Sequence, residues 1–300
     1  MARIFERRRD QNLKRIYVDV DKRERTYLLH IPKSEAPKEG YPVIFVLHGG
    51  GGRASGTSIT TAFHSHKLGK KFIVVYPDAV ELNGKRNWAD RRTVTVQGRE
   101  AFSKVDDVGF LCFILDSLIK SYKVNQKRVF STGISNGAFM SQTFAAEKSD
   151  RIAAIAPAIG GMAESVGKNF KPKFPVSVLL INGTKDPLVP YEGGYVRFGK
   201  QKLGKTLSVD EIVNLWVKHN GCQKNPKVEK LPDRDKTDGS QVVKYTYGNG
   251  RLGSKVLLLK IIGGGHNWPG ARKYAPQFLI GKTCYDLNAT DYVIRFFLQF

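Results

Sequence analysis

The stretch that decides the fold is Arg128-Val-Phe-Ser-Thr-Gly133-Ile-Ser135-Asn-Gly137-Ala-Phe-Met140. Residues 128–132, with the β-branched Val129 and Thr132 and the aromatic Phe130, predict a strand, and residues 138–148 predict a helix. The G-x-S-x-G pattern between them is typical of a sharp strand-to-helix turn, where glycines relieve crowding and the serine is lifted above the sheet. We therefore interpret Ser135 as a nucleophile; a glycine turn with a capping serine is the structural alternative.

A serine hydroxyl needs a base to become nucleophilic, and sequences with this turn order their residues as serine, acid, then histidine. Of the six histidines, only His266 follows the last predicted strand (256–262), inside a glycine-rich loop. Asp186 follows the predicted strand 176–181, in Asn182-Gly-Thr-Lys-Asp-Pro187. Asp186 is therefore the predicted acid that orients His266 and stabilises its charged form.

A predicted oxyanion hole completes this arrangement. The backbone N–H of Asn136, directly after the serine, supplies one donor. The loop His48-Gly-Gly-Gly-Gly52 follows the predicted strand 43–47, and its glycines let backbone donors face a reacting carbonyl. Gly50 is the predicted second donor, with Gly51 as the alternative. A Walker-type phosphate loop is excluded because no G-K-S/T follows the glycines.

Strand and helix patterns alternate from residue 43 to the end, which predicts a mostly parallel sheet with helices on both faces. Residues 14–20 and 26–31 predict two antiparallel strands at the start. Further helices are expected at 58–68, 105–120, 209–219 and 290–299. Residues 224–253 are polar and predict an inserted loop and hairpin, with 242–247 as one strand. The whole chain, 1–300, is predicted to form a single α/β domain.

Six blocks in order along the chain resemble the polyhydroxybutyrate depolymerase and feruloyl esterase group of α/β-hydrolases. They are Leu47-His-Gly-Gly-Gly-Gly52, Val75-Tyr-Pro-Asp-Ala79, Val105-Asp-Asp-Val-Gly-Phe110, Gly133-Ile-Ser-Asn-Gly-Ala138, Asn182-Gly-Thr-Lys-Asp-Pro187 and Gly264-Gly-His-Asn-Trp-Pro-Gly270. The resemblance runs from about residue 27 to residue 297. It implies the α/β-hydrolase fold and the triad Ser135, Asp186 and His266, in agreement with the loop positions.

The predicted activity is a serine carboxylic ester hydrolase that works through an acyl-enzyme and needs no cofactor and no metal. A feruloyl-type (hydroxycinnamoyl) ester is the favoured substrate, and a polyhydroxybutyrate polyester is the alternative. Two other hypotheses are a serine peptidase with the same triad and a non-catalytic protein that binds polyanions. Trp88 and Trp268 are predicted to contact the substrate, because both follow strands near the predicted site.

Composition limits the partners. The 300 residues carry 49 Lys and Arg against 27 Asp and Glu, a formal charge of +22, yet no nucleic-acid motif accompanies the basic residues, which include the run Arg7–Arg9. No stretch reaches the roughly 18 apolar residues that a membrane span needs. The three cysteines cannot build a disulfide scaffold, and Cys222 lacks the nearby partner usual in the group. The resemblance implies secretion with the signal peptide removed, a cytoplasmic location stays open, and the sequence does not predict an oligomeric state.

Overall fold

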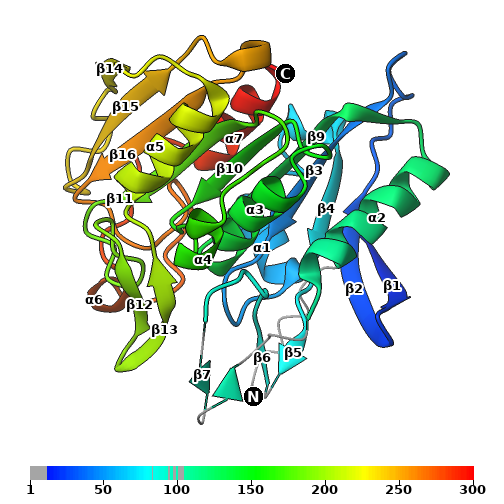
Figure 1. The fold of residues 1–300 in the computed structure, drawn as a ribbon, viewed down its shortest axis with the longest axis horizontal. Coiled ribbons are helices and arrows are strands. Elements are labelled where there is room, and N and C mark those ends of the chain that lie inside the picture. The colour runs from blue at the N-terminus through cyan, green and yellow to red at the C-terminus, as the bar shows by residue number, and fades with distance from the viewer. Residues whose placement is uncertain (1–11, 83, 94, 97–98, 101–104) are drawn as a thin grey trace, which may run out of the picture.

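A ten-stranded sheet is the centre of the computed structural model (Figure 1). The structure describes residues 12–300 apart from 83, 94, 97–98 and 101–104, so the run Arg7–Arg9 lies outside the described residues. The strands of the sheet are β1 (Lys14–Val20), β2 (Arg23–His30), β3 (Tyr41–Leu47), β4 (Ile73–Pro77), β9 (Val124–Ile134), β10 (Ala154–Ala158), β11 (Ser177–Gly183), β14 (Lys227–Lys230), β15 (Gln241–Tyr247) and β16 (Val256–Ile262). Their order across the sheet is β1-β2-β4-β3-β9-β10-β11-β16-β15-β14.

The six central strands, from β4 to β16 in that order, run parallel to one another. The first two strands and the last two pair antiparallel at the two edges of the sheet. This arrangement confirms the predicted mostly parallel sheet with antiparallel N-terminal strands. Because parallel strands end at one edge, the loops that follow β3, β9, β11 and β16 meet there.

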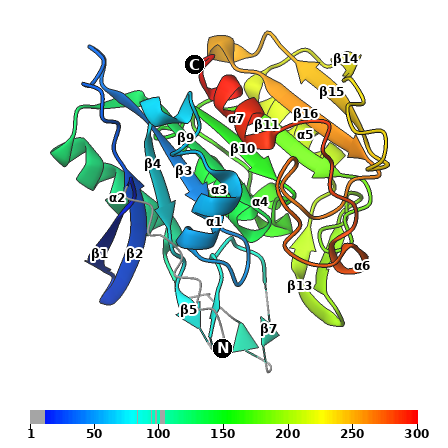
Figure 2. The same ribbon diagram turned by 180° about the vertical axis from the view of Figure 1, so that it is seen from behind.

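Helices cover both faces of the sheet. On one face lie α2 (Asp107–Ser121), α3 (Asn136–Glu147), α4 (Glu164–Lys168) and α5 (Val209–Asn220) (Figure 1). The opposite face carries α1 (Ala54–Thr61) and α7 (Ala289–Phe297) (Figure 2). Each face encloses its own apolar layer: Phe110, Phe144 and Trp216 belong to the first, and Phe72, Phe130 and Phe297 to the second. Burial of these large side chains on both faces is what holds the sheet between the helices.

Several small elements lie at the end of the sheet where the parallel strands stop (Figures 1 and 2). They are the hairpins β5–β6 (Glu81–Leu82, Lys85–Arg86), β7–β8 (Thr95–Val96, Arg99–Glu100) and β12–β13 (Gly194–Phe198, Gln201–Thr206), and the short helix α6 (Gln277–Ile280). Two 3₁₀ turns, Gly69–Lys71 and Arg251–Gly253, complete the described elements. Among the described helices, none combines the length and apolarity needed to cross a bilayer.

The structure differs from the sequence predictions at one predicted helix and at one hairpin that was not predicted. The helix expected at 58–68 forms four residues earlier and ends at Thr61, because Ala62 adopts the left-handed conformation (φ 48°) and its N–H bonds back to Ser58. The β12–β13 hairpin was not predicted, since its glycines and lysines hide the alternation of a strand. Within residues 224–253, β14 and β15 form a hairpin that extends the main sheet beyond β16.

Candidate active site

Ser135 occupies a strained turn between β9 and α3. Its backbone has φ 54° and ψ −116°, which only a tightly determined turn imposes on a residue with a side chain, and its N–H donates to Ala158 O at 3.1 Å. The flanking glycines are required by space: a Cβ at Gly133 would meet the backbone of Gly137, and a Cβ at Gly137 would meet the carbonyl oxygen of Leu47. The half-buried serine therefore stands at the N-terminus of α3, as the G-x-S-x-G pattern predicts.

Asp186 and His266 meet at the same edge of the sheet, after β11 and β16. The distance from Asp186 Oδ2 to His266 Nδ1 is 2.7 Å, and the two side chains are 2% and 4% exposed. The other oxygen, Asp186 Oδ1, accepts the N–H groups of Leu188 (2.8 Å) and Val189 (2.9 Å), and the N–H of His266 donates to Ile280 O at 2.5 Å. With Nδ1–H donating to the carboxylate, Nε2 of His266 is left as the basic nitrogen.

The structure thus joins two of the three predicted catalytic residues directly. Within the described residues, no hydrogen bond connects Ser135 Oγ to the His266 ring. Hydrogen bonds of this kind are commonly long in free enzymes and shorten when a substrate binds.

The two predicted oxyanion donors face each other across the glycine loop. A Cβ built on Gly50 would lie 3.8 Å from the Cβ of Asn136. The N–H of Gly51 is already used, because it donates to Arg86 O at 2.7 Å. In the part of the chain that the structure describes, the N–H groups of Gly50 and Asn136 have no acceptor. Gly50 is therefore better suited than Gly51 to bind a developing oxyanion.

His48, which sequence reasoning did not assign a role, holds this loop in place. Its Nδ1 donates to Gly49 O (2.7 Å) and its Nε2 accepts the N–H of Ala79 (3.0 Å), so the ring links the ends of β3 and β4. Complete burial lowers the pKa of His48 to about 4, and the ring is neutral near pH 7. The sequence signal that could have assigned His48 this role is its position directly before the glycines of the loop.

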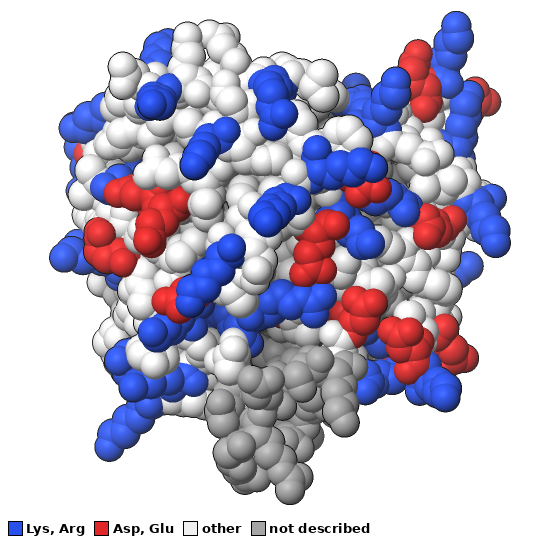
Figure 3. Space-filling view, in the orientation of Figure 1, with Lys and Arg blue, Asp and Glu red and all other residues white. Residues whose placement is uncertain are grey.

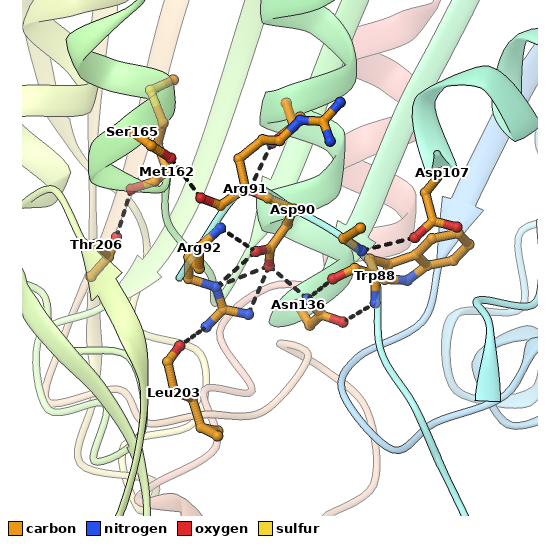
Figure 4. Close-up of polar contacts among 12 residues, drawn as sticks. Trp88, Asp90, Arg91, Arg92, Asp107, Asn136, Met162, Ser165, Leu203 and Thr206 are labelled. Atoms are coloured by element: carbon orange, nitrogen blue, oxygen red, sulfur yellow. Dashed lines mark hydrogen bonds and ion pairs between the residues drawn. The ribbon is translucent and has the colours of Figure 1, made fainter. Parts of the chain in front are cut away.

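A buried polar network surrounds the side chain of Asn136 (Figure 4). Its side-chain Oδ1 accepts the N–H of Trp88 at 2.7 Å, and its Nδ2 donates to Asp90 Oδ2 at 2.6 Å. Asp90 also forms a buried ion pair with Arg92, with 2.7 Å between Oδ2 and Nη2. Arg92 Nη1 then donates to Leu203 O (3.0 Å) in β13. The network connects the residue after the nucleophile to the β12–β13 hairpin.

The predicted substrate contacts of Trp88 and Trp268 are corrected by the structure, because both residues are only 2% exposed. Trp88 donates through Nε1 to His48 O at 2.9 Å and lies against the His48 ring, with 5.0 Å between centroids. Trp268 donates through Nε1 to Thr290 Oγ1 (3.1 Å) at the start of α7 and packs edge-on against Phe63. Both indoles fix the loops of the site in position and offer no free face to a substrate.

The segment after His266 carries exposed aromatic and aliphatic side chains. Phe278 and Leu279 of α6 are 83% and 50% exposed, and Tyr274 is also exposed. Partial burial of its phenol, and next the negative charge of Asp186, raise the pKa of Tyr274 to about 12. The segment is bound to the site through the hydrogen bond between His266 and Ile280.

One group of potential metal ligands occurs among the described residues, formed by Asp238, Cys284 and Asp286. Its carboxylates hold backbone N–H groups: Asp238 Oδ2 accepts from Tyr285 (2.7 Å), and Asp286 Oδ1 accepts from Arg234 (2.7 Å). The group therefore has a structural role: it connects the loop at 234–238 with the loop at 284–286.

The chain is similar to known esterases. It is 28% identical over 284 residues to a putative esterase of Nocardia uniformis subsp. tsuyamanensis, covering 92% of this chain and 80% of the relative. It is 32% identical over 163 residues to feruloyl esterase B of Piromyces equi, covering 54% of this chain and 29% of the relative. The acetyl xylan esterase structure from Aspergillus awamori superimposes with a TM-score of 0.55 at 16% identity, over 85% of this chain and 94% of that one. No protein-family model matches the chain.

The fold and these relatives define a carboxylic ester hydrolase with the α/β-hydrolase fold. Within that class, the matches confirm the predicted resemblance to the feruloyl esterases. They give no specific support to the polyhydroxybutyrate depolymerase half of the group.

Proposed function

We propose that the protein hydrolyses feruloyl-type esters, with Ser135 as nucleophile, His266 as general base and Asp186 as the acid that orients it. The observation that carries the proposal is the buried 2.7 Å contact between Asp186 and His266, at the sheet edge that also bears the strained turn of Ser135. The proposal concerns this chain alone, which spans less than a third of the feruloyl esterase from Piromyces.

The proposed reaction has two steps. Ser135 Oγ attacks the ester carbonyl carbon while His266 Nε2 takes the hydroxyl proton, and the N–H groups of Gly50 and Asn136 bind the resulting oxyanion. The C–O bond to the alcohol breaks, and the alcohol leaves with the proton from His266. Water then loses a proton to His266 and attacks the acyl-serine, which releases the acid and restores Ser135.

A hydroxycinnamoyl acyl group is favoured for two reasons. The feruloyl esterase of Piromyces equi is among the relatives, and the exposed rings of Tyr274 and Phe278 follow His266 in the chain. Aromatic rings prefer offset or edge-on contacts with other rings, so a phenolic acyl group suits this segment.

The test is a substrate panel of methyl ferulate, 4-nitrophenyl acetate, polyhydroxybutyrate and a feruloyl amide, run with wild type, Ser135→Ala and Ser55→Ala. We expect methyl ferulate to be hydrolysed fastest, Ser135→Ala to lose at least about a thousandfold in kcat, and the exposed Ser55→Ala control to match wild type. If polyhydroxybutyrate is hydrolysed fastest, the substrate is a polyester and not a feruloyl-type ester. If the feruloyl amide is hydrolysed fastest, the protein is an amide hydrolase and not an esterase. Unchanged hydrolysis by Ser135→Ala would reject the triad.

Phe278→Ala tests the acyl contact. The KM for methyl ferulate should rise severalfold with little change for 4-nitrophenyl acetate, because the acetyl group of the second ester has no ring to place against Phe278. Tyr17→Ala is the matched control, since it removes another exposed aromatic side chain (63% exposed, against 83% for Phe278) from β1 at the far edge of the sheet. Equal effects on both esters would remove Phe278 from the proposed acyl site.

Secretion is part of the same proposal and is supported by the resemblance to the feruloyl esterases. The three thiols of Cys112, Cys222 and Cys284 are free and add no support for an oxidising compartment. Detection of the protein in the medium of intact producing cells, with a cytoplasmic marker retained, is the expected result; retention with that marker would reject secretion.

A further inference from the structure

The outward face of the β12–β13 hairpin gathers positive charge around one aromatic ring. Three cations lie over the ring of Tyr195, at distances from its centroid of 4.5 Å for Lys202, 5.2 Å for Lys205 and 5.9 Å for Arg197. Lys200 is exposed at the turn. Basic side chains gather over this hairpin at the lower left of Figure 3. We call this surface, made by Tyr195, Arg197, Lys200, Lys202 and Lys205, the basic hairpin face.

These positive charges are not balanced by the protein itself. Arg197 pairs directly across the hairpin with Lys202, and like charges in that position destabilise a two-stranded ribbon. Residues 194–205 contain no Asp or Glu. Across the described residues, none of the four cations makes an ion pair within 4.0 Å. A bound anion would relieve this repulsion, so the face is already arranged for a negatively charged ligand.

The hairpin is fixed relative to the candidate active site. Its inner side chains Val196 and Leu203 pack with Phe139 of α3, one helical turn after Ser135. The N–H of Arg197 donates to Leu188 O at 2.9 Å, and the N–H of Leu188 donates to Asp186 Oδ1. On the other strand, Leu203 O accepts from Arg92 in the network around Asn136 (Figure 4). The basic hairpin face is therefore bound both to the loop of the predicted acid and to the predicted oxyanion hole.

We propose that the basic hairpin face binds the carboxylate groups of an acidic polysaccharide, and so holds the polymer whose ester is cleaved nearby. This inference rests on the proposed function for the ester and adds the partner. Carboxylates along the polymer would pair with Arg197, Lys202 and Lys205, where arginine can bind a carboxylate with two parallel hydrogen bonds. Phe198, 64% exposed at the turn, offers an apolar surface for the faces of sugar rings. Ring faces combined with spaced cations fit a charged carbohydrate chain.

The test compares two triple variants that remove the same charge. The first variant, Lys200→Gln/Lys202→Gln/Lys205→Gln, changes the hairpin. The second, Lys120→Gln/Lys123→Gln/Lys127→Gln, changes exposed lysines near the start of β9, at the opposite ends of the parallel strands from the candidate active site. Binding to polygalacturonate is measured by titration calorimetry at 20 and 200 mM NaCl, with fully methyl-esterified polymer as the uncharged probe and single-stranded DNA as a second polyanion. Thermal unfolding verifies that both variants are folded.

We expect the hairpin variant to bind polygalacturonate about tenfold more weakly than wild type, and the control to bind nearly as wild type does. Binding should weaken at the higher salt concentration and be lost with the methyl-esterified polymer. Equal binding by the two variants, or equal binding of charged and esterified polymer, would overturn the proposal. Tighter binding of DNA would assign the face to nucleic acid instead. Because binding is measured without turnover, a failed esterase assay leaves this result intact, and a failed binding assay leaves the esterase proposal intact.

Discussion

Asn136 Nδ2 lies 2.6 Å from Asp90 Oδ2, and both residues are buried. The same residue Asn136 carries the backbone N–H proposed for the oxyanion hole. Its side chain is thus held by a carboxylate whose other contacts go to Arg92. Asp90 has no contact with the reacting atoms in the proposed mechanism, so we regard it as a positioning residue.

Asp90→Asn should reduce kcat for methyl ferulate by about tenfold or more with little change in KM, because the oxyanion donor is displaced while ground-state binding is kept. The buried charge of Arg92 loses its partner, which should lower the free energy of unfolding by about 3 kcal/mol. Asp116→Asn is the control, since it removes a more exposed carboxylate, the partner of Arg151. If Asp90→Asn lowers the free energy of unfolding by this amount but leaves kcat unchanged, Asp90 has a purely structural role.

Asp186→Asn should lower kcat by about 10⁴-fold, because the amide favours the wrong tautomer of His266. An asparagine Oδ1 can still accept the N–H groups of Leu188 and Val189, so the loop should keep its shape. Steady-state kinetics with a parallel thermal unfolding curve checks both statements. Retention of a tenth of the activity in a folded variant would exclude Asp186 as the acid.

Two glycine variants should have opposite effects on stability. A Cβ at Gly137 meets the backbone carbonyls of Leu47 and His48, which cannot move aside, and Gly137→Ala should cost about 3 kcal/mol or more. Gly56 lies in α1 with open space around its Cβ position, and Gly56→Ala should stabilise by about 0.5–1 kcal/mol. Urea unfolding measures both. A stable, active Gly137→Ala variant would show that the turn has room for a Cβ beside Leu47 O.

Stability should fall with acidity because of His48. Its pKa is about 4 in the folded protein against about 6.5 when unfolded, so the unfolded chain binds the extra proton between these values. The free energy of unfolding should therefore decrease from pH 6.5 to pH 4, with about 3 kcal/mol attributable to this group, and His48 adds no further change below pH 4. His48→Gln should flatten that slope when unfolding is followed in urea at several pH values. If the free energy of unfolding of His48→Gln falls as steeply with pH as that of wild type, groups other than His48 cause the acid sensitivity.

Sequence reasoning about the site was possible where chemistry constrains residue type and position. The turn around Ser135 and the loops of Asp186 and His266 follow apolar strands, so their place at one sheet edge follows from the parallel order. The choice between Gly50 and Gly51 needed the structure, because it depends on which N–H is already bonded to Arg86.

Other predictions failed because sequence position does not report side-chain direction. Trp88 and Trp268 follow strands as expected, yet their indoles turn inward to hydrogen-bond acceptors. The β12–β13 hairpin is held by Phe139 and Arg92, which are distant in sequence, and its own residues carry little strand propensity. Long-range contacts of this kind leave no local pattern.

The antiparallel strands at the two borders of the sheet affect how molecules of this protein meet one another. β14 presents Lys227, Glu229 and Lys230, and β1 presents Lys14 and Arg15. Charged side chains on an outermost strand discourage another chain from adding to its free hydrogen-bonding groups. With a formal charge of +22 also repelling neighbouring molecules, concentrated solutions should resist growth into β-rich aggregates.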